Sequence, residues 1–451
     1  MRKYTTTKPS GVEWLGDVPA HWEVIKLTRL FDRIGSGTTP STNSVDYYDG
    51  EIPWVTTAEL RETVIYDTKQ KVTQLALAEH SALKLYKAGA VVIAMYGATI
   101  GRLGILGVDA TLNQACCVFE NPIGVDSKFF YYWLWAERPT LISLSTGGGQ
   151  PNLSQDLLKQ LKMPVPPLDE QRVIAAFLDE RTAHLDSLIR RKEDLLKLLT
   201  EQRAALITRA VTRGLDVVAP LRDSGVPWLG QVPAHWEVKR LKFGLAAINP
   251  VGSNLPLPED ALVSFVPMTA VGEYGGLDLE MEKPLDEIGS GYTYFADNDV
   301  VVAKITPCFE NGKGALATGL TNGVGFGTTE LHVLRHNAEM DSQFLFLLTI
   351  SEPFRKLGEG EMIGAGGQKR VPEEFIKNLM APFPPIDEQR EIAAAINQIN
   401  ERSDKMTDIT NREIAKLREY RAALITAAVT GRIDVRAEVA STPEPALVDA
   451  L

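Results

Sequence analysis

Apolar residues recur at heptad-like spacing in two long stretches of the chain, and this pattern predicts two long helices. Steps of four and three residues through 174–209 and through 392–427 meet mainly apolar side chains. Residues 170–211 contain neither glycine nor proline, so we expect a helix of about 63 Å there. Asp169 is the expected N-cap and Gly214 the expected stop. The simplest partner for each apolar seam is the other helix, in an intramolecular coiled coil.

Polar residues interrupt the first seam at three positions. Arg181, Lys192 and Gln202 fall on steps that are otherwise apolar. Such residues either set the register of a coiled coil or contact another subunit, and both interpretations stay open.

Shorter apolar runs separated by turn residues precede each predicted long helix. The runs that indicate strands are residues 34–40, 52–55, 90–94, 263–267 and 300–305, and the helical patches are 127–144 and 342–357. Short β runs mixed with helical patches are typical of an α+β fold.

Three sequence motifs occur twice, which makes the chain a tandem repeat. Residues 14–24 return at 228–238 with ten of eleven positions identical, 166–172 return at 384–390, and 203–208 return unchanged at 421–426. The sequences between these motifs look largely unalike. Two unrelated domains, each with a helix packed on its own core, are the alternative. The shared helix starts and ends disfavour that alternative.

The predicted fold is therefore α+β, with two globular α/β domains separated by two long antiparallel helices in a pseudo-two-fold arrangement. Its segments are a first variable domain (1–163), a first long helix (164–219), a second variable domain (220–381), a second long helix (382–436) and a tail expected to be disordered (437–451).

Composition indicates a soluble, cytoplasmic protein. Apolar residues make up 44% and charged residues 23% of the chain, and neither a membrane-spanning run nor a signal peptide is recognisable. Cys116, Cys117 and Cys308 lack metal-ligand spacing, so we expect reduced packing residues. The net charge of −11 disfavours strong nucleic-acid binding by the isolated chain. The acidic excess lies mostly in 220–381, however, and a local basic strip can still bind phosphate.

Each variable domain contains a strand that leads into a glycine-rich loop with a basic residue. The loop after 91–94 ends in Arg102, and the loop after 300–303 ends in Lys313. Either side chain could reach a phosphate or a guanine edge. A second glycine-rich loop near the end of each domain carries an aligned glutamine, which could pair with adenine; these residues are Gln150 and Gln368. The alternative for any one loop is an ordinary solvated turn.

The repeated tryptophans could stack on bases, but identical repetition favours core packing. They are Trp14, Trp22, Trp228 and Trp236. No nucleotide-binding loop, dinucleotide-binding glycine motif, amino-methyltransferase motif or metal-ligand cluster occurs in the sequence. We therefore expect no catalysis by this chain.

The order of the doubled motifs resembles the specificity subunit of type I restriction–modification systems. The resemblance rests on those motifs and on residues 35–40 and 304–314, and it covers nearly the whole chain. It implies that each variable segment is a target-recognition domain that reads one half of a split, asymmetric site in double-stranded DNA. It also implies that the helices set the spacer and dock two methyltransferase subunits, which carry S-adenosylmethionine, so that no cofactor is expected in this chain. Restriction and translocase subunits would join them, and no membrane would be involved.

The resemblance and the loop chemistry together select candidate DNA-reading residues. In the first domain they are Thr38, Thr39, Tyr96, Arg102, Gln150 and Asn152. In the second they are Lys304, Asn311, Lys313, Gln368, Lys369 and Arg370. The rival hypotheses are a non-catalytic coiled-coil scaffold with two ligand-binding domains not specific for DNA, and a stand-alone enzyme, which the missing motifs disfavour.

Overall fold

The chain divides into two compact units, and each long helix contributes to both of them. The computed structural model describes residues 2–145, 152–252, 255–289, 291–365 and 367–439. Unit 1 comprises Met1–Lys192 with Arg412–Leu451, and unit 2 comprises Glu193–Asn411. Within the described ranges, no helix combines the length and the apolar character needed to cross a membrane.

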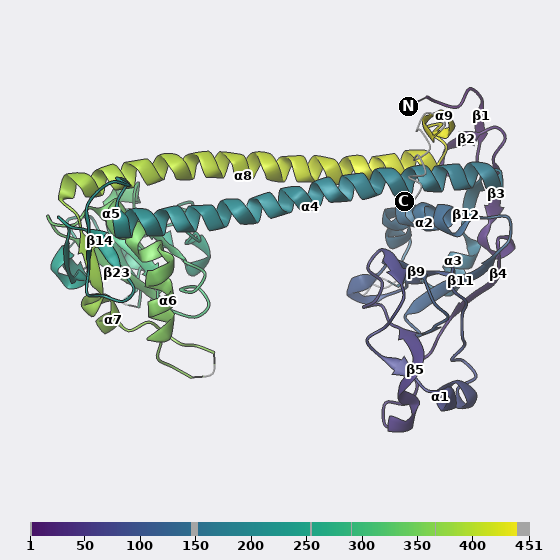
Figure 1. The fold of residues 1–451 in the computed structure, drawn as a ribbon, viewed down its shortest axis with the longest axis horizontal. Helices are drawn as coiled ribbons and strands as arrows, with labels where there is room; N and C mark the ends of the chain where they lie inside the picture. The colour runs from purple at the N-terminus through teal and green to yellow at the C-terminus, as the bar shows by residue number, and fades with distance from the viewer. Residues whose placement is uncertain (1, 146–151, 253–254, 290, 366, 440–451) are drawn as a thin grey trace, which may run out of the picture. The chain divides into compact units, whose positions relative to one another are not determined.

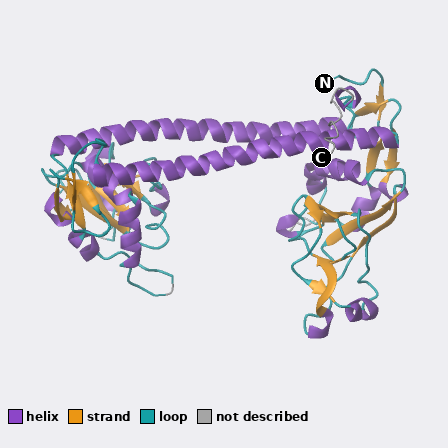
Figure 2. Cartoon of the chain, viewed as in Figure 1, coloured by secondary structure: helices purple, strands orange, loops and turns teal. Residues whose placement is uncertain are grey.

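The described residues of the first variable segment, which belongs to unit 1, form twelve short strands and three α-helices. Figures 1 and 2 show these elements. The strands are β1 (Thr7–Pro9), β2 (Asp17–Pro19), β3 (Glu23–Lys26), β4 (Phe31–Ser36), β5 (Tyr48–Val55), β6 (Thr63–Ile65), β7 (Lys71–Val72), β8 (Val91–Ala94), β9 (Leu103–Leu106), β10 (Thr111–Leu112), β11 (Cys116–Pro122) and β12 (Lys162–Val165). The helices are α1 (Gln74–Glu79), α2 (Ser127–Ser143) and α3 (Gln155–Gln160). The main sheet has the order β4-β11-β8-β9-β6, and a smaller one has the order β10-β5-β7.

Unit 2 contains the second variable segment, in which the residues that the structure describes again form twelve strands and three α-helices. The strands are β13 (Leu221–Asp223), β14 (Gln231–Pro233), β15 (Glu237–Arg240), β16 (Leu245–Ile248), β17 (Leu262–Val266), β18 (Glu282–Pro284), β19 (Thr293–Ala296), β20 (Val300–Ala303), β21 (Gly314–Leu316), β22 (Val324–Gly327), β23 (Leu331–His336) and β24 (Met380–Phe383). The helices are α5 (Ser342–Ile350), α6 (Glu352–Gly360) and α7 (Glu373–Asn378). Its sheets have the orders β16-β23-β20-β21 and β18-β17-β22-β19.

The two variable segments share one scaffold although their sequences differ. The antiparallel order β4-β11-β8-β9 in unit 1 matches β16-β23-β20-β21 in unit 2. In the smaller sheets, β5 and β17 each have one parallel neighbour and one antiparallel neighbour. The repeat therefore extends into the segments that sequence comparison shows as unlike. The predicted α+β class, with a long helix after each α/β segment, is confirmed.

The long helices are α4 (Leu168–Arg213) and α8 (Ile386–Val429). The expectation that Asp169 caps the first helix is wrong, because the helix already begins at Leu168 and Asp169 lies in its first turn. The expected stop is confirmed: Gly214 adopts a φ of +72°, which a side chain would disfavour. In unit 1, α4 and α8 run antiparallel, since Lys192 pairs with Glu413 and Asp186 pairs with Arg421.

The buried stripe on each long helix matches the predicted heptad steps at some positions, including Leu424, and lies one residue later at others. In α4, Leu178 and Leu185 are buried as predicted, but Ile207 is buried where the heptad steps predict Leu206. In α8 the buried residue is Ile414, one position after the predicted Glu413. A straight helix with 3.6 residues per turn drifts about 20° per heptad, so a strict seven-residue repeat leaves the packed face.

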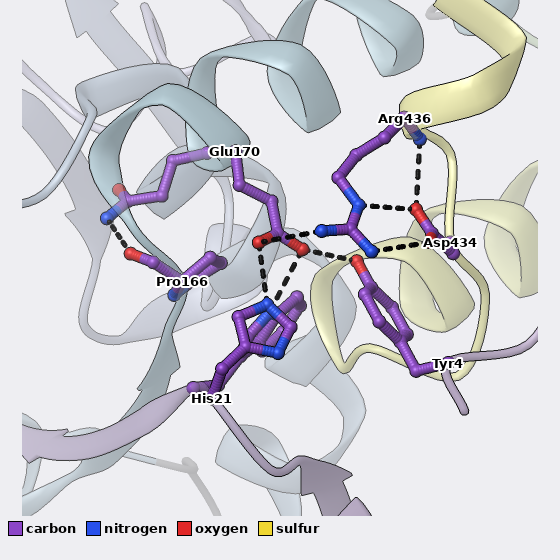
Figure 3. Close-up of polar contacts among 8 residues, drawn as sticks. Tyr4, His21, Pro166, Glu170, Asp434 and Arg436 are labelled. Carbon is purple, nitrogen blue, oxygen red and sulfur yellow. Dashed lines mark hydrogen bonds and ion pairs between the residues drawn. The ribbon is translucent and has the colours of Figure 1, made fainter. Parts of the chain in front are cut away.

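A cluster around the start of α4 ties the repeated motif to the helix in unit 1 (Figure 3). The Glu170 carboxylate, only 6% exposed, accepts hydrogen bonds from Tyr4 Oη (2.6 Å) and Trp22 Nε1 (3.1 Å) and contacts His21 Nε2 (2.8 Å). Arg436 approaches the same carboxylate at 3.9 Å. Burial and the hydrogen bond to Glu170 raise the pKa of Tyr4, so its hydroxyl stays a donor.

Unit 2 repeats this cluster in reduced form. Glu388 accepts a hydrogen bond from Trp236 Nε1 (3.1 Å) and contacts His235 Nε2 (2.8 Å). Its carboxylate is 27% exposed. In unit 1 the segment after α8 completes the cluster, and Asp434 pairs with Arg2 along the backbone. In unit 2 the chain continues from α4 directly into β13.

The preference for core packing holds for two of the four repeated tryptophans. Trp22 and Trp236 are buried beneath the helix starts. Trp228 is half-buried against the core of unit 2. The expectation is wrong for Trp14, which lies in the turn before β2 and is 44% exposed.

Candidate nucleic-acid interface

The described candidate residues of unit 1 gather at one end of its main sheet. β4 and β8 both run antiparallel to β11, and Ser36 and Ile93 pair with the same residue, Cys117. The loops that leave β4 and β8 therefore emerge at the same edge. Gln150, one of the predicted residues, lies outside the described residues.

The loop between β8 and β9 presents Tyr96 and Arg102. Backbone hydrogen bonds from Ala94 to the carbonyl of Arg102 (2.8 Å) and from Gly101 to the carbonyl of Ala94 (2.9 Å) close the loop. The Arg102 side chain is exposed, and it has no ion pair or hydrogen bond to the described residues. Its guanidinium is thus available to a ligand. Tyr96 is half-buried, and burial raises its pKa.

Asn152 lies beside Tyr96. The two residues form an isolated β-bridge, and the Leu153 amide donates to the Met95 carbonyl (2.7 Å). Leu153 is buried whereas Asn152 is exposed. The buried leucine therefore anchors the loop and leaves the amide side chain of Asn152 at the surface.

Thr38 and Thr39 reach the same end of the sheet from β4. The Thr38 amide donates to the Leu112 carbonyl (3.0 Å), and Thr39 Oγ1 donates to Gln114 Oε1 (2.5 Å). Gly37 makes this approach possible, since a Cβ there would lie 1.6 Å from the Leu112 carbonyl oxygen. Gln114 is a polar neighbour that sequence reasoning missed.

Unit 2 has the same construction at the end of β20. The Ala303 amide donates to the Lys313 carbonyl (2.9 Å), as Ala94 does to Arg102 in unit 1. This contact makes Lys313 the structural counterpart of Arg102, as the sequence predicted. Two other candidate residues lie on the same loop, between β20 and β21. Asn311 is exposed, and Lys304, at the start of the loop, is half-buried.

Lys313 differs from Arg102 because its charged group has a hydrogen-bond partner within the protein. Its Nζ donates to the Met268 carbonyl oxygen (2.9 Å), and the side chain is partly buried. The ammonium group thus has a protein partner, whereas Arg102 has none among the described residues. Equivalent backbone positions therefore offer different chemistry in the two units.

The segment with Gln368, Lys369 and Arg370 lies against the β20 loop. Ile305 forms a β-bridge with Arg370, and the Val371 amide donates to the Lys304 carbonyl (2.8 Å). These contacts reproduce the Tyr96–Asn152 bridge and the Leu153 anchor of unit 1. The side chains of all three residues are exposed.

Arg370 pairs side-on with Glu330, a residue that the sequence did not single out. Nε and Nη2 donate to the two carboxylate oxygens at 2.9 and 2.8 Å. The hydrogen bond from Arg370 lowers the pKa of Glu330, and the hydrogen bond to Glu330 raises the pKa of Arg370. The partners are forty residues apart, so no local motif could reveal the pair.

Other chemistry is sparse in the described part of the chain. No group of three or more histidine, cysteine, aspartate or glutamate side chains there could hold a metal ion. Cys116 and Cys117 are buried free thiols, and burial raises both pKa values, that of Cys117 to about 12. These cysteines are packing residues rather than nucleophiles.

Comparison with known proteins identifies the family. The family model described as "Type I restriction modification DNA specificity domain" matches residues 19–198 and 290–419, which together make up more than half of the chain. The chain belongs to the type I restriction–modification specificity family. The resemblance seen in the doubled motifs is thereby confirmed.

Members of this family from bacteria and archaea resemble the chain to different extents. The specificity subunit of the type I restriction enzyme EcoAI from Escherichia coli is 36% identical over 217 residues, which are 47% of this chain and 36% of that protein. The match thus spans little more than a third of that relative. The MjaVIII specificity subunit of Methanocaldococcus jannaschii is 22% identical over 447 residues, or 93% of this chain and 94% of the relative.

Solved structures support the fold of this specificity-family chain. The HsdS subunit from Thermoanaerobacter tengcongensis aligns with a TM-score of 0.53 at 17% identity, over 92% of this chain and 98% of that one. A chain from a structure titled for complex assembly and conformational transition of the type I R-M system aligns with a TM-score of 0.69 at 16% identity, over 92% and 99%. At such identities the likeness concerns the fold alone.

Proposed function

We propose that the chain is the DNA-reading specificity subunit of a type I restriction–modification complex, in which each unit reads one half of a split, asymmetric DNA site. The observation that carries this proposal is a shared sheet scaffold that presents different polar side chains at equivalent positions. Asn152 in unit 1 corresponds to Arg370 in unit 2, and Arg102 corresponds to Lys313. Two different half-sites require one framework with different base-contacting side chains.

The acidic net charge is compatible with DNA binding within a complex. Lys304, Lys369 and Arg370 lie close together at the end of the unit 2 sheet, where a local basic surface can face phosphates. Partner subunits would supply the rest of the phosphate neutralisation. We therefore expect weak DNA binding by the chain alone and tight binding by the assembled complex.

The repeated helices are the proposed docking surface for two methyltransferase subunits. In unit 1 a groove of about 320 Å³ lies between α4 and α8, with Leu185 and Leu424 in its lining. In unit 2 a groove of about 200 Å³ between the same helices includes Leu206, the counterpart of Leu424 at the 218-residue offset. Nearby apolar side chains are exposed, among them Leu198 at 61%. Two identical partners would need such repeated apolar surfaces.

The continuous helices also support a role in setting the spacer between the half-sites. Insertion of seven helical residues into both α4 and α8 should lengthen the spacer by about three base pairs, at ~1.5 Å per residue and ~3.4 Å per base pair. An unchanged spacer in such a variant would contradict this part of the proposal.

We propose that the chain itself is non-catalytic. S-adenosylmethionine and methyl transfer to adenine would belong to the methyltransferase subunits, and DNA cleavage and translocation to restriction subunits. Methyl transfer by the purified chain alone would overturn this division of labour.

Methylome sequencing of the host with this gene present and deleted tests the proposed function. A bipartite motif should disappear on deletion, and exchange of residues 25–146 for another such segment should change only one half of it. A motif that is not bipartite would contradict two separate readers. Gel shifts of the chain with its methyltransferase that show no sequence preference would favour a scaffold without DNA specificity.

A further inference from the structure

The geometry of one ion pair points to the kind of base that unit 2 reads; this inference rests on the proposed function. We propose that Arg370 reads a guanine in the unit 2 half-site and that Glu330 is the positioning residue that orients it.

The ion pair uses one edge of the guanidinium and leaves another edge free. Glu330 accepts from Nε and Nη2 of Arg370, at 2.9 and 2.8 Å. A guanidinium has five N–H donors, so the end formed by Nη1 and the second hydrogen of Nη2 remains free. That end can donate to O6 and N7 of one guanine in the major groove, a common specific contact of arginine with DNA. The Arg370 side chain is 44% exposed, so this end can reach a ligand.

The ion pair is not needed to hold the loop in place. Backbone bridges join Arg370 to Ile305 on one side and to Ile363 on the other. The buried residue Val371 fixes the next position through its hydrogen bond to the Lys304 carbonyl (2.8 Å). A bidentate ion pair can add stability, but the backbone contacts already anchor this segment. The effect that we assign to Glu330 is orientation of the guanidinium, because both of its oxygens accept from Arg370.

The equivalent position in unit 1 carries a different base-reading side chain. Asn152 occupies the place of Arg370, since it bridges Tyr96 as Arg370 bridges Ile305. Asparagine pairs with adenine, whereas arginine pairs with guanine. The place of Glu330 is taken by Ala115, because the Met95 amide donates to its carbonyl (2.8 Å) as the Lys304 amide donates to that of Glu330 (2.9 Å). Of these two equivalent positions, the one beside the arginine carries a carboxylate and the one beside the asparagine carries a methyl group.

The charges around the pair favour DNA rather than an anionic small molecule held by one arginine. Lys369 precedes Arg370 in the chain, Lys304 precedes its bridge partner Ile305, and Glu330 is the carboxylate paired with Arg370. The two lysines can face phosphates while the arginine faces a base edge, which is the division of labour expected at a DNA groove.

Binding measurements on the assembled methyltransferase complex test the inference. Duplexes with each base pair of the unit 2 half-site replaced in turn are titrated with wild type, Arg370→Ala, Arg370→Lys and Glu330→Ala. Arg370→Ala should lose roughly 5- to 150-fold of discrimination at one G·C pair. Arg370→Lys should also lose it, because lysine lacks the planar fork. Glu330→Ala should lose part of this discrimination at the same G·C base pair. The double variant, Glu330→Ala with Arg370→Ala, should discriminate no less than Arg370→Ala alone.

A matched control is Glu352→Ala, which removes the carboxylate of an exposed ion pair with Lys356 on α6. It should leave discrimination unchanged at every position. Equal loss of affinity for all sequences in the Arg370 and Glu330 variants would overturn the inference. Full guanine discrimination by Arg370→Lys would also overturn it. The same holds if Glu330→Ala reduces discrimination at a different base pair. If the wild-type complex selects no split site, the proposed function fails together with the inference. If the wild-type complex does select a split site, these variants test the inference alone.

Discussion

Removal of the Glu170 carboxylate should destabilise unit 1 much more than removal of Glu388 destabilises unit 2. Glu170 is 6% exposed and is contacted by Tyr4, His21 and Trp22, with Arg436 at 3.9 Å. Its loss leaves the buried Trp22 indole N–H without an acceptor. Hydrogen bonds to charged groups contribute ~1.5–3 kcal/mol each, and they are not additive within one cluster. We expect Glu170→Ala to lower the free energy of unfolding of unit 1 by about 3–5 kcal/mol.

The repeat supplies the matched control. Glu388 is 27% exposed and has two of these partners, His235 and Trp236. Because Glu388 and His235 are partly exposed, water can enter the site that Glu388→Ala leaves behind, so we expect a loss of about 1–2 kcal/mol in unit 2.

Hydrogen exchange of the full chain measures both effects, because the two units need not unfold in one transition. Peptides from residues 15–30 report on unit 1, and peptides from 229–244 report on unit 2. Glu170→Gln, which keeps one acceptor oxygen, should fall between wild type and Glu170→Ala. Equal protection losses for Glu170→Ala and Glu388→Ala would refute the reasoning, since burial and the number of partners would then not determine the cost.

Two further predictions concern loops of the candidate interface, and a third concerns His332, a buried histidine on β23. Arg102→Ala should weaken cognate DNA binding of the assembled complex by ~1–3 kcal/mol in titrations. Lys313→Ala should cost less, because the Lys313 ammonium already donates to a backbone carbonyl. Unchanged affinity for both variants would remove these loops from the interface. Burial holds the pKa of His332 below its ordinary value of 6.5, so the unfolded chain binds the proton more readily, and stability should decline as pH falls below ~6.5. His332→Gln should flatten that decline in pH-dependent unfolding, and an unaltered slope would exclude the histidine as its cause. Gly37→Ala should destabilise unit 1 by ~2 kcal/mol or more in hydrogen exchange, because its Cβ would lie 1.6 Å from the Leu112 carbonyl oxygen; wild-type protection would show that the loop adapts freely.

The long helices were predictable because their signal is local and repeated. Apolar spacing and the absence of glycine and proline place the first helix at 170–211, and the structure has Leu168–Arg213. The one-residue shift of the buried stripe was not predictable from a heptad count. It depends on the exact turn angle and on the cores that each half of the helix covers.

The shared sheet scaffold could not be read from the sequence, because its strands pair over long separations. β4 pairs with β11, some eighty residues later, and the matching strands of unit 2 have unlike sequences. Many apolar sequences can fill the same buried strands, so identity disappears while the strand order stays. The repeated motifs that keep their residues form parts of α4 and α8 or pack against the starts of these helices.

The candidate site was predicted in part. Spacing after a buried strand correctly paired Arg102 with Lys313, and glycine-rich loops led to Asn152 and Arg370. The side-chain environment was beyond the sequence. Lys313 donates to a carbonyl 45 residues away, and Glu330 meets Arg370 only because β23 begins beside the loop. Such contacts arise from the tertiary fold and leave no local pattern.

The interleaving of the two units has a consequence for the order in which the chain can fold during synthesis. Unit 2 is one continuous segment, 193–411, whereas unit 1 needs residues after 412. Leu424 and Val429 belong to the core of unit 1, and Asp434 pairs with Arg2. A ribosome therefore delivers everything that unit 2 requires before it delivers the last pieces of unit 1. The part of the protein that is made first is the part that must wait longest to close, and a chaperone that shields nascent apolar surface would act mainly on unit 1.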